Sequence, residues 1–234
     1  MRIVVLLLIA FGLWADVKVA AAANMSFALP KLIEAFNEEY PTIKVFSTIG
    51  SSGKLAAQIA HGANFDLYLS ANMSYPKKLV KQGIGYSRVL PYALGELMVV
   101  SRKPLRSLQE LATLSRIAIA NPKTAPYGAA AMEVLKDSGL YEKIRSRLVF
   151  GESVAQTVSY AMHGADAAFI PRSALFSPHF PKMHLLKIDP ALYTDIRQGM
   201  VLLTKREDAQ RFFVFLLSRK AAKILRNYGY RMPE

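Results

Sequence analysis

The sequence predicts an α/β protein of two lobes, each built from a mostly parallel β-sheet flanked by helices. Short apolar segments of strand length alternate with amphipathic segments of helical length, which is the order that parallel sheets with right-handed crossovers require. This alternation runs once before residue 89 and again after it. The 234 residues are enough for two lobes with separate cores. The last segments then return toward the first half, which indicates two crossings between the lobes.

The first half contains three strand–helix units. The expected strands and helices alternate at residues 17–21, 26–40, 43–49, 54–60, 65–71 and 76–82. In the first helix the apolar residues follow helical spacing, and Pro30 lies near the start, where proline is best tolerated. Pro41, Gly62 and Gly83 follow the three helices and are typical of helix ends.

The second half repeats the alternation and ends in a long helix. Strands are expected at 92–101, 117–120, 148–150, 167–170, 184–188 and 200–204, and helices at 128–136, 154–162 and 208–228. The pattern changes at Val89, which sets the first expected boundary. Residues 16–88 are expected to form the first part of lobe I, residues 89–201 lobe II, and residues 202–234 the return to lobe I.

The N-terminus has the pattern of a secretory signal. Arg2 is followed by an apolar run, a small residue at Ala15 and the first acidic residue at Asp16. The run is too short for a permanent membrane helix, so residues 1–15 are expected to be a signal peptide that is cleaved after Ala15. A buried first strand is the alternative, because the positive segment contains a single residue.

Composition and charge exclude several classes of protein. The chain has 30 Lys and Arg against 17 Asp and Glu, a net charge of +13. These basic residues are scattered and are not interleaved with aromatic residues, so nucleic-acid binding is not expected. A diffuse positive field also raises the encounter rate with small anions. The absence of cysteine excludes disulfides and thiolate metal sites.

No catalytic or metal-binding arrangement is evident in the sequence. No pair among the four histidines has metal-ligand spacing with a carboxylate, so no site for a bare metal cation is expected. Residues 50–54 lack the spacing of a nucleotide-hydrolysing phosphate loop, and no serine has a plausible His–Asp partner. We therefore expect neither an enzyme nor a cofactor.

Four strand-to-helix junctions carry small and polar residues. They lie at residues 21–26, 50–55, 121–128 and 151–154. Free amides and hydroxyls at a helix start form an anion-binding arrangement. For each junction alone, ordinary capping and turn formation are the better explanation. Because all four fall at equivalent corners of two lobes, together they favour an anion site between the lobes.

The same junctions resemble those of the periplasmic molybdate-binding protein family. The resemblance is carried by 17–28 (VKVAAAANMSFA), 50–59 (GSSGKLAAQI), 62–71 (GANFDLYLSA), 121–128 (NPKTAPYG) and 152–154 (ESV). It is collinear over essentially the whole chain after residue 16. The resemblance implies a type II periplasmic-binding fold that holds an oxyanion between its lobes. It also implies a monomeric periplasmic protein that delivers molybdate or tungstate to the permease of an ABC transporter.

The resemblance also implies a set of ligand residues. These are the side chain and amide of Asn24, the Ser51–Ser52 pair, the amides of Tyr127 and Val154, and additionally the amide of Ala23. Asn24 stands where many members have serine and resembles a subgroup with asparagine there. A tyrosine ligand of other members corresponds here to Pro171, and the sequence does not rank Ser51 against Ser52.

The chemistry of these corners suits an anion that carries no proton. A deprotonated tetrahedral dianion offers only acceptors, whereas hydrogen phosphate also needs an acceptor in its site. The four corners contain no aspartate, and Glu152 is expected to act only as a charge at a helix N-terminus. Two alternatives stay open. One is a receptor for sulfate or a small organic anion; an organic carboxylate usually requires an arginine, and Arg172 is the candidate. The other is an enzyme or anion-sensing domain on the same fold.

Overall fold

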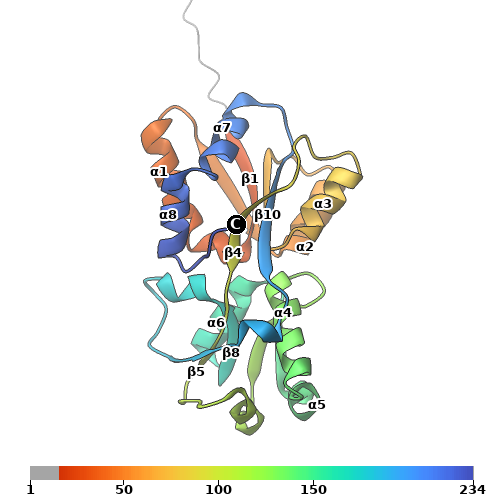
Figure 1. Ribbon diagram of the computed structural model, residues 1–234, viewed down its shortest axis with the longest axis vertical. Coiled ribbons are helices and arrows are strands. Elements are labelled where there is room, and N and C mark those ends of the chain that lie inside the picture. The colour runs from red at the N-terminus through yellow and green to blue at the C-terminus, as the bar shows by residue number, and fades with distance from the viewer. Residues whose placement is uncertain (1–15, 234) are drawn as a thin grey trace, which may run out of the picture.

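Residues 16–233 are described by a computed structural model, in which they form two lobes along the long axis of the molecule (Figure 1). The expected signal peptide, residues 1–15, lies outside the described residues. Within residues 16–233, none of the helices combines the length and the apolar character needed to cross a membrane.

The first lobe is built on a five-stranded mixed sheet with the strand order β2-β1-β3-β10-β4. Its strands are β1 (Val17–Ala22), β2 (Val45–Gly50), β3 (Leu67–Ser70), β4 (Leu90–Gly95) and β10 (Ile196–Leu202). β1 runs parallel to β2 and β3, whereas β10 runs antiparallel to β3 and β4. The parallel strands therefore all end at the edge of the sheet that faces the second lobe.

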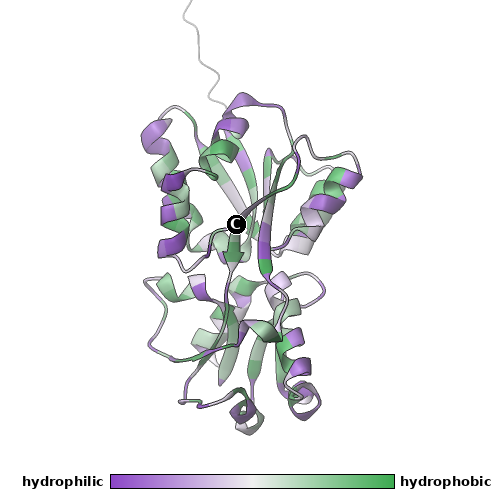
Figure 2. Cartoon of the chain, in the orientation of Figure 1, coloured by the Kyte–Doolittle hydropathy of each residue, from purple (hydrophilic) through white to green (hydrophobic). Residues whose placement is uncertain are grey.

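Helices cover both faces of this sheet. One face packs against α1 (Leu29–Glu39), α7 (Glu207–Phe215) and α8 (Arg219–Asn227), and the other against α2 (Ser52–Ala60) and α3 (Ser74–Lys81) (Figure 1). Side chains of β1 alternate between the two cores, as strand geometry requires: Val19 and Ala21 face the first and Ala20 the second. Apolar residues accordingly concentrate on the strands and on the inner faces of the helices (Figure 2).

The second lobe repeats this arrangement. Its sheet has the order β7-β6-β8-β5-β9, with β6 parallel to β7 and β8 and with β5 antiparallel to β8 and β9. The strands are β5 (Leu97–Ser101), β6 (Ile117–Ala120), β7 (Leu148–Gly151), β8 (Ala167–Pro171) and β9 (His184–Lys187). The helices are α4 (Pro126–Asp137), α5 (Tyr141–Ile144) and α6 (Val154–His163). Because both lobes share one strand order, their strand-to-helix junctions lie at equivalent corners.

Five short 3₁₀ helices complete the described chain. They are η1 (Ala23–Ser26), η2 (Leu108–Thr113), η3 (Arg145–Arg147), η4 (Arg172–Phe176) and η5 (Pro190–Leu192).

The expected single strand over residues 92–101 is wrong. The segment forms β4 in the first sheet and β5 in the second, with Glu96 between them. The carboxylate of Glu96 accepts a hydrogen bond from Arg172 at 2.8 Å, where the chain passes from one lobe to the other. Because the residues on both sides of Glu96 are buried, the hydrophobic pattern does not reveal the crossing.

Two segments also lie in a different lobe from the one expected. Residues 90–95 and 196–201 were expected in lobe II, but β4 and β10 pair with each other in the first sheet. The two crossings therefore lie near Glu96 and ahead of Ile196. The expected helix over 208–228 is also divided, because Ser218 begins a new helix by accepting a hydrogen bond from the amide of Ala221.

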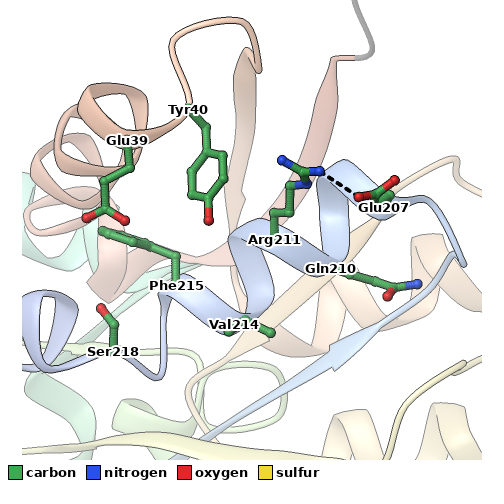
Figure 3. A pocket seen from close by; sticks show the side chains of 8 residues that line it. All are labelled: Glu39, Tyr40, Glu207, Gln210, Arg211, Val214, Phe215 and Ser218. Atoms are coloured by element: carbon green, nitrogen blue, oxygen red, sulfur yellow. Dashed lines mark hydrogen bonds and ion pairs between the residues drawn. The ribbon is translucent and has the colours of Figure 1, made fainter.

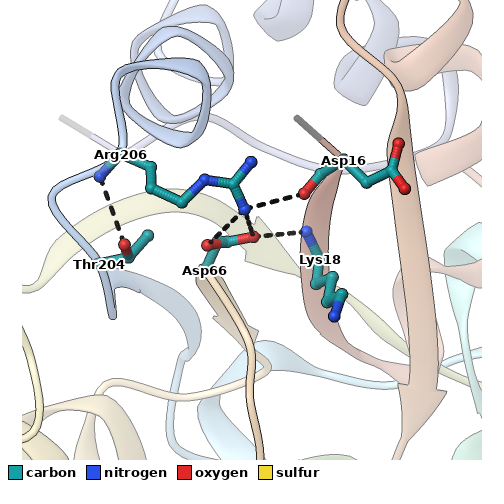
Figure 4. A network of polar contacts seen from close by, with 5 residues as sticks. All are labelled: Asp16, Lys18, Asp66, Thr204 and Arg206. Carbon is teal, nitrogen blue, oxygen red and sulfur yellow. Dashed lines mark hydrogen bonds and ion pairs between the residues drawn. The ribbon is translucent and has the colours of Figure 1, made fainter. Parts of the chain in front are cut away.

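A partly buried ion pair connects the start of β1 to the loop before α7 (Figure 4). Arg206 Nη1 lies 3.2 Å from the nearer carboxylate oxygen of Asp66 and donates to the carbonyl of Asp16 at 3.0 Å. The amide of Lys18 donates to the same carboxylate at 2.8 Å. Asp66 is therefore satisfied although its side chain is only 5% exposed.

Candidate anion-binding site

One small cavity between the lobes is lined by all six residues that the sequence analysis singled out. The space between its atoms, including the part that is open to solvent, is about 180 Å³. The residues that line it are Ala22, Ala23, Asn24, Ser51, Ser52, Ala71, Ala125, Pro126, Tyr127 and Val154. The first lobe contributes the ends of β1, β2 and β3, and the second contributes the starts of α4 and α6.

Three α-helices begin at this cavity. Ser52 is the first residue of α2, Tyr127 the second of α4 and Val154 the first of α6. The first amides of an α-helix have no carbonyl partner within the helix, and the helix dipole adds partial positive charge at the same end. Three such ends meeting from two lobes make a site that attracts an anion without any charged side chain.

Ser51 and Ser52 are distinguished by their hydrogen bonds. Ser51 is the N-cap residue of α2, yet its side chain makes no capping bond, and its Oγ is buried without a partner among the described residues. Ser52 Oγ instead accepts a hydrogen bond from the amide of Ala71 at 3.0 Å. The Ser51 hydroxyl is therefore free to donate into the cavity, whereas Ser52 Oγ is held by the Ala71 amide and keeps only its own hydrogen to donate.

Asn24 is held by a buried polar cluster. Its Nδ2 donates to Gln198 Oε1 and to Tyr230 Oη, both at 2.9 Å. The backbone carbonyl of Asn24 accepts from Tyr230 Oη at 2.9 Å and from Ser173 Oγ at 3.1 Å. Asn24 Oδ1 is buried and has no partner within residues 16–233.

Gln198 was missed by the sequence analysis, which began the last strand at Met200. It lies in β10 with no exposed surface and accepts a second hydrogen bond from Tyr92 Oη at 2.9 Å. Its Nε2 lies 3.5 Å from Tyr127 Oη. The one available signal was a glutamine directly before Gly199 and the apolar run that starts at Met200, because a buried amide requires partners.

Burial keeps the tyrosine hydroxyls of this cluster neutral. Desolvation raises the pKa of Tyr230 to about 12 and raises the pKa values of Tyr92 and Tyr127 well above the ordinary value. All three therefore act as hydroxyl donors and acceptors at physiological pH.

Among the described residues that line the cavity, none carries a charge. Glu152 was expected to act only on its own helix, but its carboxylate pairs with Lys54 of the other lobe at 2.7 Å. Hydrogen bonding to Lys54 lowers the pKa of Glu152. Both side chains are largely exposed, at 48% for Lys54 and 73% for Glu152, so the pair lies at the rim of the site.

Further contacts join the lobes beside the cavity. The amide of Gly53 donates to the carbonyl of Thr124 at 2.8 Å, and Tyr75 Oη donates to the carbonyl of Lys123 at 3.1 Å. The start of α2 thus rests against the loop that precedes α4. The two lobes are closed over the cavity in this structure.

Two other residues that the sequence analysis considered do not line the cavity. Pro171 is the last residue of β8 and pairs with Leu97. Arg172 binds Glu96, so its guanidinium is used at the lobe crossing. Across residues 16–233, no group of three His, Cys, Asp or Glu side chains is placed to hold a metal ion.

Wider grooves lie on the surface away from this cavity. One of them runs between the end of α1 and α7, where Arg211 pairs with Glu207 at 2.6 Å and its guanidinium lies over the Tyr40 ring (Figure 3). None of the residues predicted for the site lines this groove. Its charged groups have partners, Arg211 with Glu207 and Glu39 with Lys220, so it offers no comparable set of free donors.

Comparisons with known proteins show which proteins the chain is similar to. Residues 17–231 match the model of a family described as bacterial extracellular solute-binding protein. The chain is 36% identical to the molybdate-binding protein ModA of Azotobacter vinelandii, with 92% of this chain and 90% of that protein covered. It is also 36% identical to the molybdate-binding protein ModA of Rhodobacter capsulatus, over 92% and 88%. The solved structure of the Azotobacter vinelandii periplasmic molybdate-binding protein superposes with a TM-score of 0.86 at 30% identity, covering 93% of this chain and all of that one.

Proposed function

The chain belongs to the bacterial extracellular solute-binding protein family, and from that premise we infer that it captures molybdate or tungstate for an ABC importer. Members of this family are substrate-binding proteins and not enzymes. The bound oxyanion is cargo and no resident cofactor is required.

One observation carries the proposal: the starts of three α-helices and the free Ser51 hydroxyl converge on a cavity without charged side chains. A tetrahedral dianion without a proton offers only acceptors, so a site rich in donors suits it. Amides and hydroxyls place partial positive charges around the anion in several directions. This arrangement matches a tetrahedral anion better than a single salt bridge does. The ligand is then held by dipoles in a water-excluding site, where each hydrogen bond is strong.

The proposed ligand groups are the Ser51 hydroxyl, the amides of Tyr127 and Val154, and groups of Ala23 and Asn24. Because these donors come from both lobes, an anion bound to them bridges the lobes and stabilises the closed form. The permease of the transporter would recognise that closed form. We further propose that the protein is a monomer exported by the segment 1–15. We also propose that the chain crosses between its lobes near Glu96 and ahead of Ile196.

Isothermal titration calorimetry of the purified chain beginning at Asp16 tests this function, with molybdate, tungstate, sulfate and phosphate titrated separately. We expect one-to-one binding of molybdate and tungstate and much weaker binding of the other two anions. Sulfate binding as tight as molybdate binding would reassign the receptor to sulfate. Silence toward all four anions would refute oxyanion capture.

A further inference from the structure

The buried side chain of Gln198 lies directly behind the proposed site and contacts it through Asn24. Gln198 Oε1 accepts one hydrogen bond from Asn24 Nδ2 and one from Tyr92 Oη, both at 2.9 Å. Asn24 Nδ2 also donates to Tyr230 Oη, so both of its hydrogens are used within the protein. The atom of the Asn24 amide that remains without a partner is Oδ1.

This arrangement has a chemical consequence for the ligand. Asn24 lines the cavity and is 1% exposed, so its unpartnered oxygen has no access to bulk water. An acceptor next to a deprotonated oxyanion is repulsive, because neither partner supplies a hydrogen. The side chain of Asn24 can bind such an anion only if its amide turns so that Nδ2 replaces Oδ1.

Gln198 can accompany that turn because its own amide carries a donor and an acceptor. If both amides rotate by about half a turn, Gln198 Nε2 donates to Asn24 Oδ1 and to Tyr92 Oη. Gln198 Oε1 then faces Tyr127 Oη, which lies 3.5 Å from the amide of Gln198 in the structure. Every polar atom of the pair remains satisfied, and Asn24 Nδ2 becomes free to donate to the anion.

The remaining bonds of Asn24 also survive the rotation. Tyr230 Oη, which now donates to the Asn24 carbonyl, can donate to Asn24 Oδ1 instead. The carbonyl keeps its hydrogen bond from Ser173 Oγ of the second lobe. The backbone position of Asn24 is therefore unaffected by the orientation of its side-chain amide.

We propose that Gln198 is a positioning residue of the oxyanion site. Its side-chain amide can rotate together with that of Asn24, so that Asn24 presents a donor to a fully deprotonated anion. The proposal rests on the function proposed above and specifies how that site selects its ligand. Gln198 itself does not touch the anion. It acts through Asn24, so its contribution exists only while the Asn24 side chain is present.

A double-mutant cycle with Asn24→Ala, Gln198→Met and the combined variant tests this dependence, with molybdate affinity measured by calorimetry. In the otherwise unchanged protein, Gln198→Met is expected to weaken molybdate binding about tenfold, the equivalent of one hydrogen bond. In the Asn24→Ala background the same substitution is expected to change affinity less than about twofold. Gln58→Met, a substitution of an exposed glutamine on α2, is the matched control and should leave affinity unchanged.

The outcomes separate this proposal from the proposed function. Equal effects of Gln198→Met with and without Asn24, or no effect in either, would overturn the role of Gln198 and leave molybdate binding in place. An unsubstituted chain that binds no oxyanion would overturn both. If Gln198→Met does not fold by circular dichroism, Gln198→Asn replaces it, since this amide is one methylene too short to reach Asn24 and should show the same dependence.

Discussion

Replacement of Ser51 by alanine should reduce affinity for the anion without reducing stability. Serine at an N-cap normally stabilises its helix, and its loss costs about 0.5–2 kcal/mol. Ser51 makes no capping bond, and its buried hydroxyl has no partner within residues 16–233. Alanine at position 51 therefore removes an unsatisfied polar group, and we expect the free energy of unfolding to stay constant or to rise slightly.

The effect on binding is larger. A hydrogen bond from a neutral donor to a charged group contributes roughly 1.5–3 kcal/mol, which corresponds to a 10- to 150-fold increase in Kd when it is lost. Calorimetric titration with molybdate measures the affinity, and urea denaturation without ligand measures the stability. Ser47→Ala, in an exposed position of β2, the strand that ends just before Ser51, is the matched control and should alter neither quantity.

Ser52→Ala provides the contrast. Ser52 Oγ is the acceptor for the buried amide of Ala71, so its removal should lower the free energy of unfolding by about 1–3 kcal/mol. If Ser51→Ala binds molybdate as the unsubstituted chain does while Ser52→Ala loses affinity, the assignment of the hydroxyl ligand is wrong. A loss of stability in Ser51→Ala would show that its hydroxyl has a structural partner.

Three further predictions follow from contacts outside the cavity. Asp66→Ala should lower the free energy of unfolding by about 2–4 kcal/mol in urea denaturation, because it leaves the Lys18 amide and Arg206 without their shared acceptor; a smaller loss than for Ser52→Ala would contradict this. Lys54→Met should weaken molybdate binding less than about fivefold, because the pair with Glu152 is exposed, and calorimetry in high salt should abolish even this difference. Stability should be full below about pH 10, the ordinary tyrosine pKa, and should fall as the pH rises toward 12, because the folded state holds the protons of Tyr92, Tyr127 and Tyr230 that the unfolded chain releases. Denaturation at a series of alkaline pH values measures how the free energy of unfolding declines, and Tyr230→Phe should make this decline shallower. An unchanged slope would contradict the inference that Tyr230 holds its proton in the folded state.

The order of strands and helices could be predicted because most of these segments are short and are bounded by Gly, Pro or polar residues. The corner residues were also accessible, since parallel strands of one order place their ends together. The crossing between the sheets at Glu96 could not be predicted in this way. This residue interrupts a continuous apolar run, and nothing local distinguishes a crossing between sheets from one strand with a single polar residue.

The roles of Gln198 and Ser51 could not be predicted from local sequence patterns for a related reason. The partners of Gln198 are Asn24 and Tyr92, which lie 174 and 106 residues away along the chain. Two adjacent serines at a helix start look equivalent in sequence, and only the position of the Ala71 amide shows that Ser52 is engaged. These residues depend on long-range geometry, which hydrophobic periodicity does not encode.

The hydrogen bond from Gly53 to Thr124 makes one backbone proton a reporter of lobe opening. The Gly53 amide lies in the first turn of α2, where no carbonyl of its own helix can accept it, so its bond of 2.8 Å to the other lobe is its only backbone partner within the described chain. Exchange of this proton with deuterated solvent therefore requires the lobes to separate, although the fold of each lobe can stay intact. Its exchange rate measures the population of open molecules directly, and a ligand that bridges the lobes should slow this one site more than the amides in the centre of either sheet.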